Sequence, residues 1–220
     1  MQHVQRLLFG LVLLSLFVPG ATASAHKPIW GEEDGIIKIP DLVTSYAFYR
    51  DLPSGKVDAY FLEGKEGQQF NFGVQIPDLE GLQDYEVTVA LFGPGLPEGD
   101  KSQLPPDHPE DLGALIFPSA ITEEFFETFT QTNYLGRQKI TTTLPADGDY
   151  YLLVWQPDGL AGKYVLDSGR AENFAPGDLF LFPIWWVQVR VYFGQGPLLL
   201  AIASVILLAG IAIILRRRKK

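Results

Sequence analysis

Cysteine is absent from this chain of 220 residues, and histidine is scarce, with three residues. The absence of cysteine excludes a disulfide scaffold, a cysteine-ligated zinc or iron–sulfur site and a cysteine nucleophile. Gly-x-Ser-x-Gly, His-Glu-x-x-His and a glycine-rich phosphate loop are also absent. Serine hydrolases that use the Gly-x-Ser-x-Gly motif and the common zinc peptidases that use His-Glu-x-x-His are thereby excluded. The sequence predicts a protein that is not an enzyme.

What is present at the N-terminus is the pattern of a secretory signal peptide, over residues 1–25. Arg6 precedes an apolar run from Leu7 to Val18, and Ala23-Ser24-Ala25 supplies the small residues that signal peptidase requires. The apolar run is too short to span a bilayer, which takes roughly 20 residues. We expect cleavage after Ala25 or after Ala23.

The C-terminal end reads as a transmembrane helix over residues 198–215. This segment is uncharged and rich in leucine, isoleucine and alanine, and the five cations of residues 216–220 follow it directly. Cations beside a membrane span favour the cytoplasmic side. The sequence therefore predicts a prokaryotic single-pass type I protein of the cell membrane, with its domain at the cell surface and a short basic tail in the cytoplasm.

Acidic residues outnumber basic ones, 26 to 17. Six of the cations belong to the predicted signal peptide and tail, so the predicted ectodomain has a net charge of about −15. Such a surface repels the phosphates of nucleic acids. Nucleic acid is therefore excluded as a partner.

Residues 26–172 show mainly the two-residue alternation of β-strands, with turn residues between the runs. This pattern predicts an all-β ectodomain, an antiparallel β-sandwich of the jelly-roll type. A long proline-rich loop is expected at 93–111, and a helix only at 122–130. The expected strands are 45–49, 57–62, 69–76, 85–92, 112–117, 138–144, 149–155 and 162–166.

Three segments resemble the bacterial pre-peptidase C-terminal (PPC) domain. They are Val57–Phe61 with Gly67-Gln68, the stretch Leu144–Val154, and Gly162–Leu166. The resemblance covers residues 57–168 and implies a β-sandwich accessory module of exported proteins, often non-catalytic. Segments 25–28, 93–97 and 129–134 also look similar to a group of uncharacterised bacterial surface proteins.

Residues 173–197 form an aromatic segment next to the predicted span. Tryptophan and tyrosine favour the headgroup level of a bilayer. We therefore expect Trp185, Trp186, Tyr192 and Phe193 at the membrane interface. A docking site for a membrane partner is the alternative.

His26 would be the first residue of the mature chain after cleavage at Ala25. Its amine and imidazole would form a nitrogen pair suited to copper, with His108 as a third donor. The alternative is that His26 has no role in metal binding and is merely the residue that follows the signal-peptide cleavage site.

Acidic clusters offer further candidate sites. Asp147 and Asp149, or residues 32–34, could bind calcium, although an acidic hairpin turn explains the first pair equally. Glu123, Glu124 and Glu127 could supply a pair of catalytic carboxylates, or simply a solvated helix face.

The sequence as a whole predicts a non-catalytic, membrane-anchored, extracytoplasmic binding or assembly module. Membrane lipid and another envelope protein are the candidate partners. The alternative is a copper-binding surface protein that uses His26.

Overall fold

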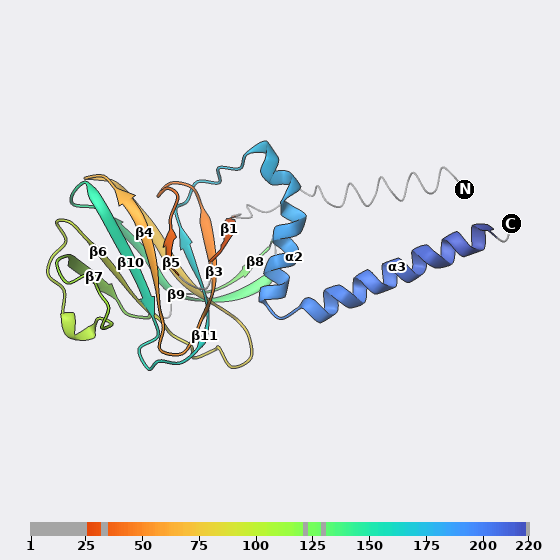
Figure 1. The fold of residues 1–220 in the computed structure, drawn as a ribbon, viewed down its shortest axis with the longest axis horizontal. Helices are drawn as coiled ribbons and strands as arrows, with labels where there is room; N and C mark the ends of the chain where they lie inside the picture. Colours follow the sequence, from red (N-terminus) through yellow and green to blue (C-terminus); the bar gives the residue numbers. More distant parts are fainter. Residues whose placement is uncertain (1–25, 32–34, 121–122, 129–130, 219–220) are drawn as a thin grey trace.

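The computed structural model describes residues 26–31, 35–120, 123–128 and 131–218. The predicted signal peptide and the acidic residues 32–34 lie outside this part of the chain. The described residues form two β-sheets that pack face to face, followed by two helices (Figure 1). The predicted β-sandwich is therefore confirmed.

The six-stranded sheet has the order β1-β3-β11-β5-β9-β8, and the five-stranded sheet has the order β2-β4-β10-β6-β7. Neighbouring strands are antiparallel, with two exceptions. The short edge strand β1 runs parallel to β3, and the short edge strand β2 runs parallel to β4. Each of the eight predicted strands overlaps an observed one. The first sheet contains β1 (Lys27–Trp30), β3 (Tyr46–Leu52), β5 (Gln69–Pro77), β8 (Glu124–Glu127), β9 (Thr132–Thr143) and β11 (Gly162–Ser168); the second contains β2 (Ile36–Lys38), β4 (Val57–Gly64), β6 (Thr88–Gly93), β7 (Gly113–Phe117) and β10 (Gly148–Trp155).

The main core lies between the two sheets and consists of alternate side chains from each strand. Phe48, Leu166 and Phe70 come from the six-stranded sheet, and Tyr60 and Leu152 come from the other; all five are fully buried. Because side chains on a strand alternate between faces, the intervening residues point to the outer faces. These residues are also partly apolar, so each outer face needs a cover.

The loop between β6 and β7 covers the outer face of the five-stranded sheet. It contains the short 3-10 helix η1 (Lys101–Gln103), and its Leu104 and Leu112 pack against Phe92 and Trp155. The long loop predicted at 93–111 is therefore observed, and it covers the outer face of the five-stranded sheet.

The structure corrects the helix predicted at 122–130. Residues Glu124–Glu127 form β8 instead, paired antiparallel with β9. The ring of Phe125 stacks on Tyr134 at 5.2 Å, whereas Phe126 is 54% exposed. Phe125 and Phe126 thus point to opposite sides, as a strand requires, and β9 supplies the backbone hydrogen bonds of β8.

The predicted juxtamembrane segment forms the 3-10 helix η2 (Pro176–Phe180) and the helix α2 (Phe182–Tyr192), and α3 (Gly196–Arg218) follows. Helix α2 packs on the outer face of the six-stranded sheet, where Val189, Tyr192 and Phe193 bury against Ala47 and Val165. Tyr192 and Phe193 are therefore buried against protein, and their place at the membrane interface stays a prediction. Trp185 and Trp186 are half-buried.

The compact unit of the chain extends beyond residue 172, the expected end of the sandwich. Lys27 of β1 forms an ion pair with Asp178 of η2 at 2.8 Å. The Tyr192 hydroxyl lies 2.9 Å from the carbonyl oxygens of both Arg50 and Tyr164. These contacts fasten η2 and α2 to the sandwich.

We expect Tyr192→Phe to lower the free energy of unfolding by about 1–3 kcal/mol, because two buried carbonyl oxygens lose their hydroxyl partner. Urea unfolding of the detergent-solubilised chain measures this change. Tyr151→Phe is the matched control, since the Tyr151 hydroxyl has no hydrogen bond to a described residue, and its effect should stay within about 0.5 kcal/mol. Equal effects of the two substitutions would show that α2 is not docked.

Candidate functional site

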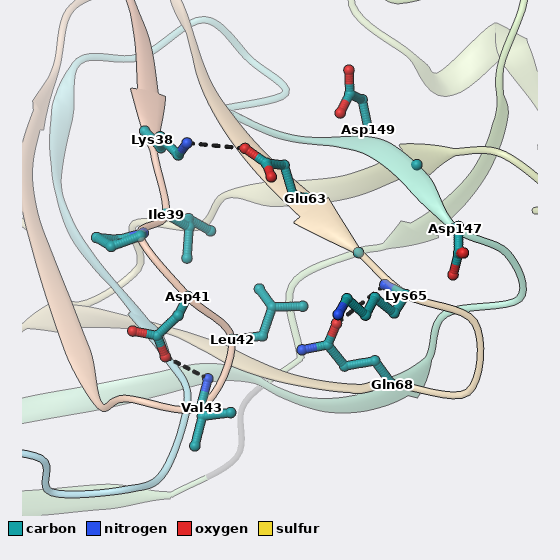
Figure 2. A pocket seen from close by; sticks show the side chains of 13 residues that line it. Lys38, Ile39, Asp41, Leu42, Val43, Glu63, Lys65, Gln68, Asp147 and Asp149 are labelled. Atoms are coloured by element: carbon teal, nitrogen blue, oxygen red, sulfur yellow. Dashed lines mark hydrogen bonds and ion pairs between the residues drawn. The ribbon is translucent and has the colours of Figure 1, made fainter.

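Two open pockets mark the described surface as candidates for binding. The polar pocket lies where β4 ends and β10 begins, and has a volume of about 550 Å³ (Figure 2). Its floor includes the apolar Ile39 and Leu42, and its rim carries the charged Lys38, Glu63 and Lys65. Asp41, Asp147 and Asp149 also line it.

Most carboxylates of the polar pocket already have structural partners. Glu63 pairs with Lys38 at 3.0 Å, and Asp147 accepts a hydrogen bond from the Glu66 amide at 2.8 Å. Figure 2 shows the Asp147 and Asp149 side chains pointing in different directions. Among the described residues no group of three metal-binding side chains converges. The geometry thus agrees with the hairpin-turn interpretation of Asp147 and Asp149, in which Asp147 fastens one turn to another.

Asp41 has a similar structural role. Its carboxylate accepts hydrogen bonds from the amides of Val43 at 2.9 Å and Thr44 at 2.6 Å, and from the Tyr46 hydroxyl at 2.9 Å. Burial by itself would raise the pKa of Asp41, but these bonds outweigh it and leave the pKa below its ordinary value. The carboxylate therefore holds the turn before β3 and is not available as a ligand.

The aromatic pocket is the larger of the two, with a volume of about 680 Å³, and lies between β1, β3, β4 and α2. Its wall is made of Trp30, Tyr49 and Tyr192. Trp30 stacks on Tyr49 at 4.6 Å, and Tyr192 meets Tyr49 edge-on at 5.2 Å. Lys56 lies at the rim and makes no ion pair with a described residue. Among the described residues, the pocket thus combines a flat apolar wall with a lysine at its rim.

A buried ion pair forms the base of the aromatic pocket. The Arg50 guanidinium of β3 donates two hydrogen bonds to the Asp58 carboxylate of β4, at 2.8 and 2.9 Å. The Tyr164 hydroxyl donates to the same carboxylate at 2.6 Å and lies 2.8 Å from the Tyr60 hydroxyl. Every carboxylate oxygen of Asp58 therefore has a partner, and the pair links the two sheets.

The tyrosines of this region stay neutral at physiological pH. Burial raises the pKa of Tyr49 and of Tyr192 well above the ordinary value, with further increases from neighbouring acidic groups. Burial likewise raises the pKa of Tyr164. A phenol that does not ionise is a poor general base at neutral pH. These groups are suited to stacking and hydrogen bonding rather than to proton transfer.

The two histidines of the predicted copper site lie on opposite outer faces of the sandwich. His26 lies beside β3, its Nδ1 2.5 Å from the Ser45 hydroxyl. His108 stacks on Phe92, on the outer face of the five-stranded sheet, at 6.1 Å. Two sheets that pack about 10 Å apart separate these side chains. The structure does not bring them together, and copper binding by His26 stays a prediction without its third donor.

An acidic side chain does lie near His26. Burial raises the pKa of Asp167 above its ordinary value, and the charge of His26 opposes this shift. Asp167 also accepts a hydrogen bond from the side-chain amide of Gln75, at 3.0 Å. This carboxylate takes part in the packing of the sheet surface.

The glutamates considered for catalysis do not form a facing pair. Glu123 pairs with Lys139 at 2.9 Å. Glu124 and Glu127 stand at the two ends of β8, and residues three apart on a strand point to opposite faces. The arrangement offers no pair of carboxylates across a substrate.

Trp30, Arg50 and Asp58 had no role in the predictions from sequence. A signal for the ion pair was available, because Arg50 and Asp58 each occupy an inward position of an alternating strand. A charged residue at such a position needs a partner of opposite charge. Trp30 lies on an edge strand too short to show a period.

Family models show no match to this chain, and curated proteins show none either. Solved structures with a similar fold include PliG of Aeromonas hydrophila, a periplasmic inhibitor of g-type lysozyme, at 16% identity and a TM-score of 0.36, covering 66% of this chain and 98% of PliG. The pre-peptidase C-terminal domain of collagenase from Bacillus anthracis matches at 15% identity and a TM-score of 0.34, over 62% of this chain and 96% of that domain. CorA of Methylomicrobium album BG8, a surface-associated copper-binding protein, matches at 11% identity and a TM-score of 0.33, over 62% of this chain and 98% of CorA. The predicted PPC resemblance is therefore recovered, and it concerns the fold alone.

We expect Asp58→Leu to lower the free energy of unfolding by about 3–5 kcal/mol, because it leaves the Arg50 guanidinium buried without its carboxylate. The double variant Arg50→Met/Asp58→Leu should recover most of this loss, since no unpaired charge remains. Urea unfolding of the two variants measures both values. A double variant as unstable as the sum of the single changes would contradict this account.

Proposed function

We propose that the protein is a non-catalytic, membrane-anchored binding module outside the cytoplasm, and that the aromatic pocket is its ligand site. The observation that carries the proposal is the pocket itself, the larger of the two described, with three aromatic rings around a fully paired Arg50–Asp58 base. Ligand sites typically combine an apolar wall with a few polar groups.

The lining of the pocket favours a particular class of ligand. A flat ring can stack on Trp30 and Tyr49. The available Lys56 ammonium at the rim favours an anionic substituent on that ring. Asp58 is neutralised by Arg50 and does not oppose an anion. We therefore propose a small aromatic anion as the ligand.

The anchor in this proposal is α3. Its segment Gly196–Ile214 is long and apolar enough to cross a membrane, and none of it is buried in the described structure. Basic residues follow this segment. Those residues support a cytoplasmic C-terminus.

Binding can be tested by saturation-transfer NMR with benzoate, 4-hydroxybenzoate and phenyl phosphate. At least one of these probes should bind, and Lys56→Ala should weaken its binding about tenfold by removing a charge-assisted contact. Lys65→Ala, which removes an equivalent ammonium from the polar pocket, is the matched control and should change nothing. Equal effects of the two variants, or no binding of any probe, would contradict the aromatic pocket as the site.

The topology can be tested with single cysteines, because the chain has none of its own. Leu160→Cys, in an exposed loop of the sandwich, should react with a membrane-impermeant maleimide in cells stripped of any outer barrier. A cysteine added after Lys220 should react only after detergent is added. The opposite pattern would place the sandwich in the cytoplasm.

A further inference from the structure

Helix α2 is apolar on both its inward and its outward side, although the sandwich covers only the inward one. Its sequence, FPIWWVQVRVY, contains one charged residue, Arg190, and one other strongly polar residue, Gln188. The inward side, which includes Val189 and Tyr192, is buried on the six-stranded sheet. A helix that is hydrophobic on all sides is normally covered on all sides. The uncovered side therefore needs an apolar environment from elsewhere.

The uncovered side presents a continuous set of large aliphatic and aromatic side chains, here called the outward stripe. Residues spaced three and four apart share one helix face, and Ile184, Val187 and Val191 have this spacing. Three more residues, from η2 and the start of α2, extend it. The stripe consists of Leu179, Phe180, Leu181, Ile184, Val187 and Val191, which are between 41% and 84% exposed.

Hydrogen bonds within the turn between α2 and α3 restrict the angle between these two helices. Gly194 has φ of +73°, a conformation that glycine adopts without strain. The Gly194 amide bonds to the Val191 carbonyl, and the Gln195 amide to the Arg190 carbonyl, which is the Schellman pattern of a helix end. The Arg190 guanidinium adds bonds to Gln195 at 2.5 Å and to Gln131 at 2.9 Å. The link to the span is therefore a structured turn.

Figure 1 shows the consequence for the arrangement of the helices. Helix α2 runs across the direction of α3 and lies between the sandwich and the side toward which α3 extends. If α3 crosses a bilayer, a helix that runs across it lies along the bilayer surface. The outward stripe then faces the same lipid that surrounds α3.

We infer that α2 lies flat in the headgroup region of the bilayer, with the outward stripe in contact with lipid chains. The six-stranded sheet then faces the membrane through α2, and the five-stranded sheet faces away. This inference rests on the proposed anchoring by α3. It assigns lipid contact to the residues of the outward stripe.

The test uses the full chain in vesicles of phosphatidylcholine and phosphatidylglycerol. Single nitroxide-labelled cysteines replace Ile184 and Val187 in the outward stripe. Leu160, which is 58% exposed in the loop between β10 and β11, is the matched control. Collisions with oxygen, which enters lipid, and with a water-soluble nickel chelate report the surroundings of each label. The ratio of oxygen to nickel collisions should be at least about fivefold higher at 184 and 187 than at 160.

Two outcomes would overturn the inference. Ratios at 184 and 187 equal to that at 160 would mean that the stripe faces water. Protection of both labels from both reagents would mean that protein covers the stripe, either a second copy of the chain or another envelope protein.

A label at Val205, in the middle of α3, separates this inference from the proposed anchoring. A high oxygen ratio at 205 together with a low ratio at 184 and 187 refutes only the placement of α2. A low ratio at 205 refutes the anchoring itself.

Discussion

The packing of α2 on the outer face of the six-stranded sheet is the contact on which the rest of the molecule depends. A sheet with apolar residues on both faces cannot leave one face in water. Ala47, Tyr134 and Val165 make the outer face of this sheet apolar, and Val189 and Tyr192 of α2 cover it. The segment that leads to the apolar helix α3 is thereby part of the domain, and a structured turn joins α2 to α3.

Tyr192 connects this contact to the interior. Its hydroxyl meets the Arg50 carbonyl, while the Arg50 side chain reaches through the core to Asp58 on the opposite sheet. One residue of β3 thus contacts the helix with its backbone and the five-stranded sheet with its side chain. Because a buried ion pair is sensitive to the loss of either partner, the relative position of the two sheets is closely specified here.

The sequence allowed the central strands to be predicted well, because each buries one face and shows a two-residue period. The short parallel strands β1 and β2 have too few residues to show a period, and their position depends on a neighbour that is remote in the chain. Residues 122–130 were wrongly predicted as a helix because the local sequence does not show the pairing with β9, in which Phe125 stacks on Tyr134 while Phe126 points to solvent.

The candidate site was less predictable than the fold. The aromatic pocket gathers residues from β1, β3, β4 and α2, which no local pattern relates. His26 and His108 were considered together only because histidine is scarce, and the sandwich places them on opposite faces. Tyr192 was expected at the membrane interface because aromatic residues before a span suit either that interface or a protein surface. Its packing on the outer face of the sheet could not be predicted from the local sequence.

The aromatic pocket and the packing of α2 on the sheet share Tyr192, which gives the proposed site a property beyond binding. Tyr192 forms part of the pocket wall and also holds α2 against the sheet. A ligand that contacts this ring favours the docked position of α2, and by linkage the docked helix must raise the affinity of the ligand by the same factor. Lys163 strengthens the connection, since its ammonium lies 4.5 Å from the Tyr192 ring and pairs with Asp51 at 3.0 Å. If the proposed ligand binds in this pocket, its binding is coupled to the position of α2 on the sheet through this one packing contact.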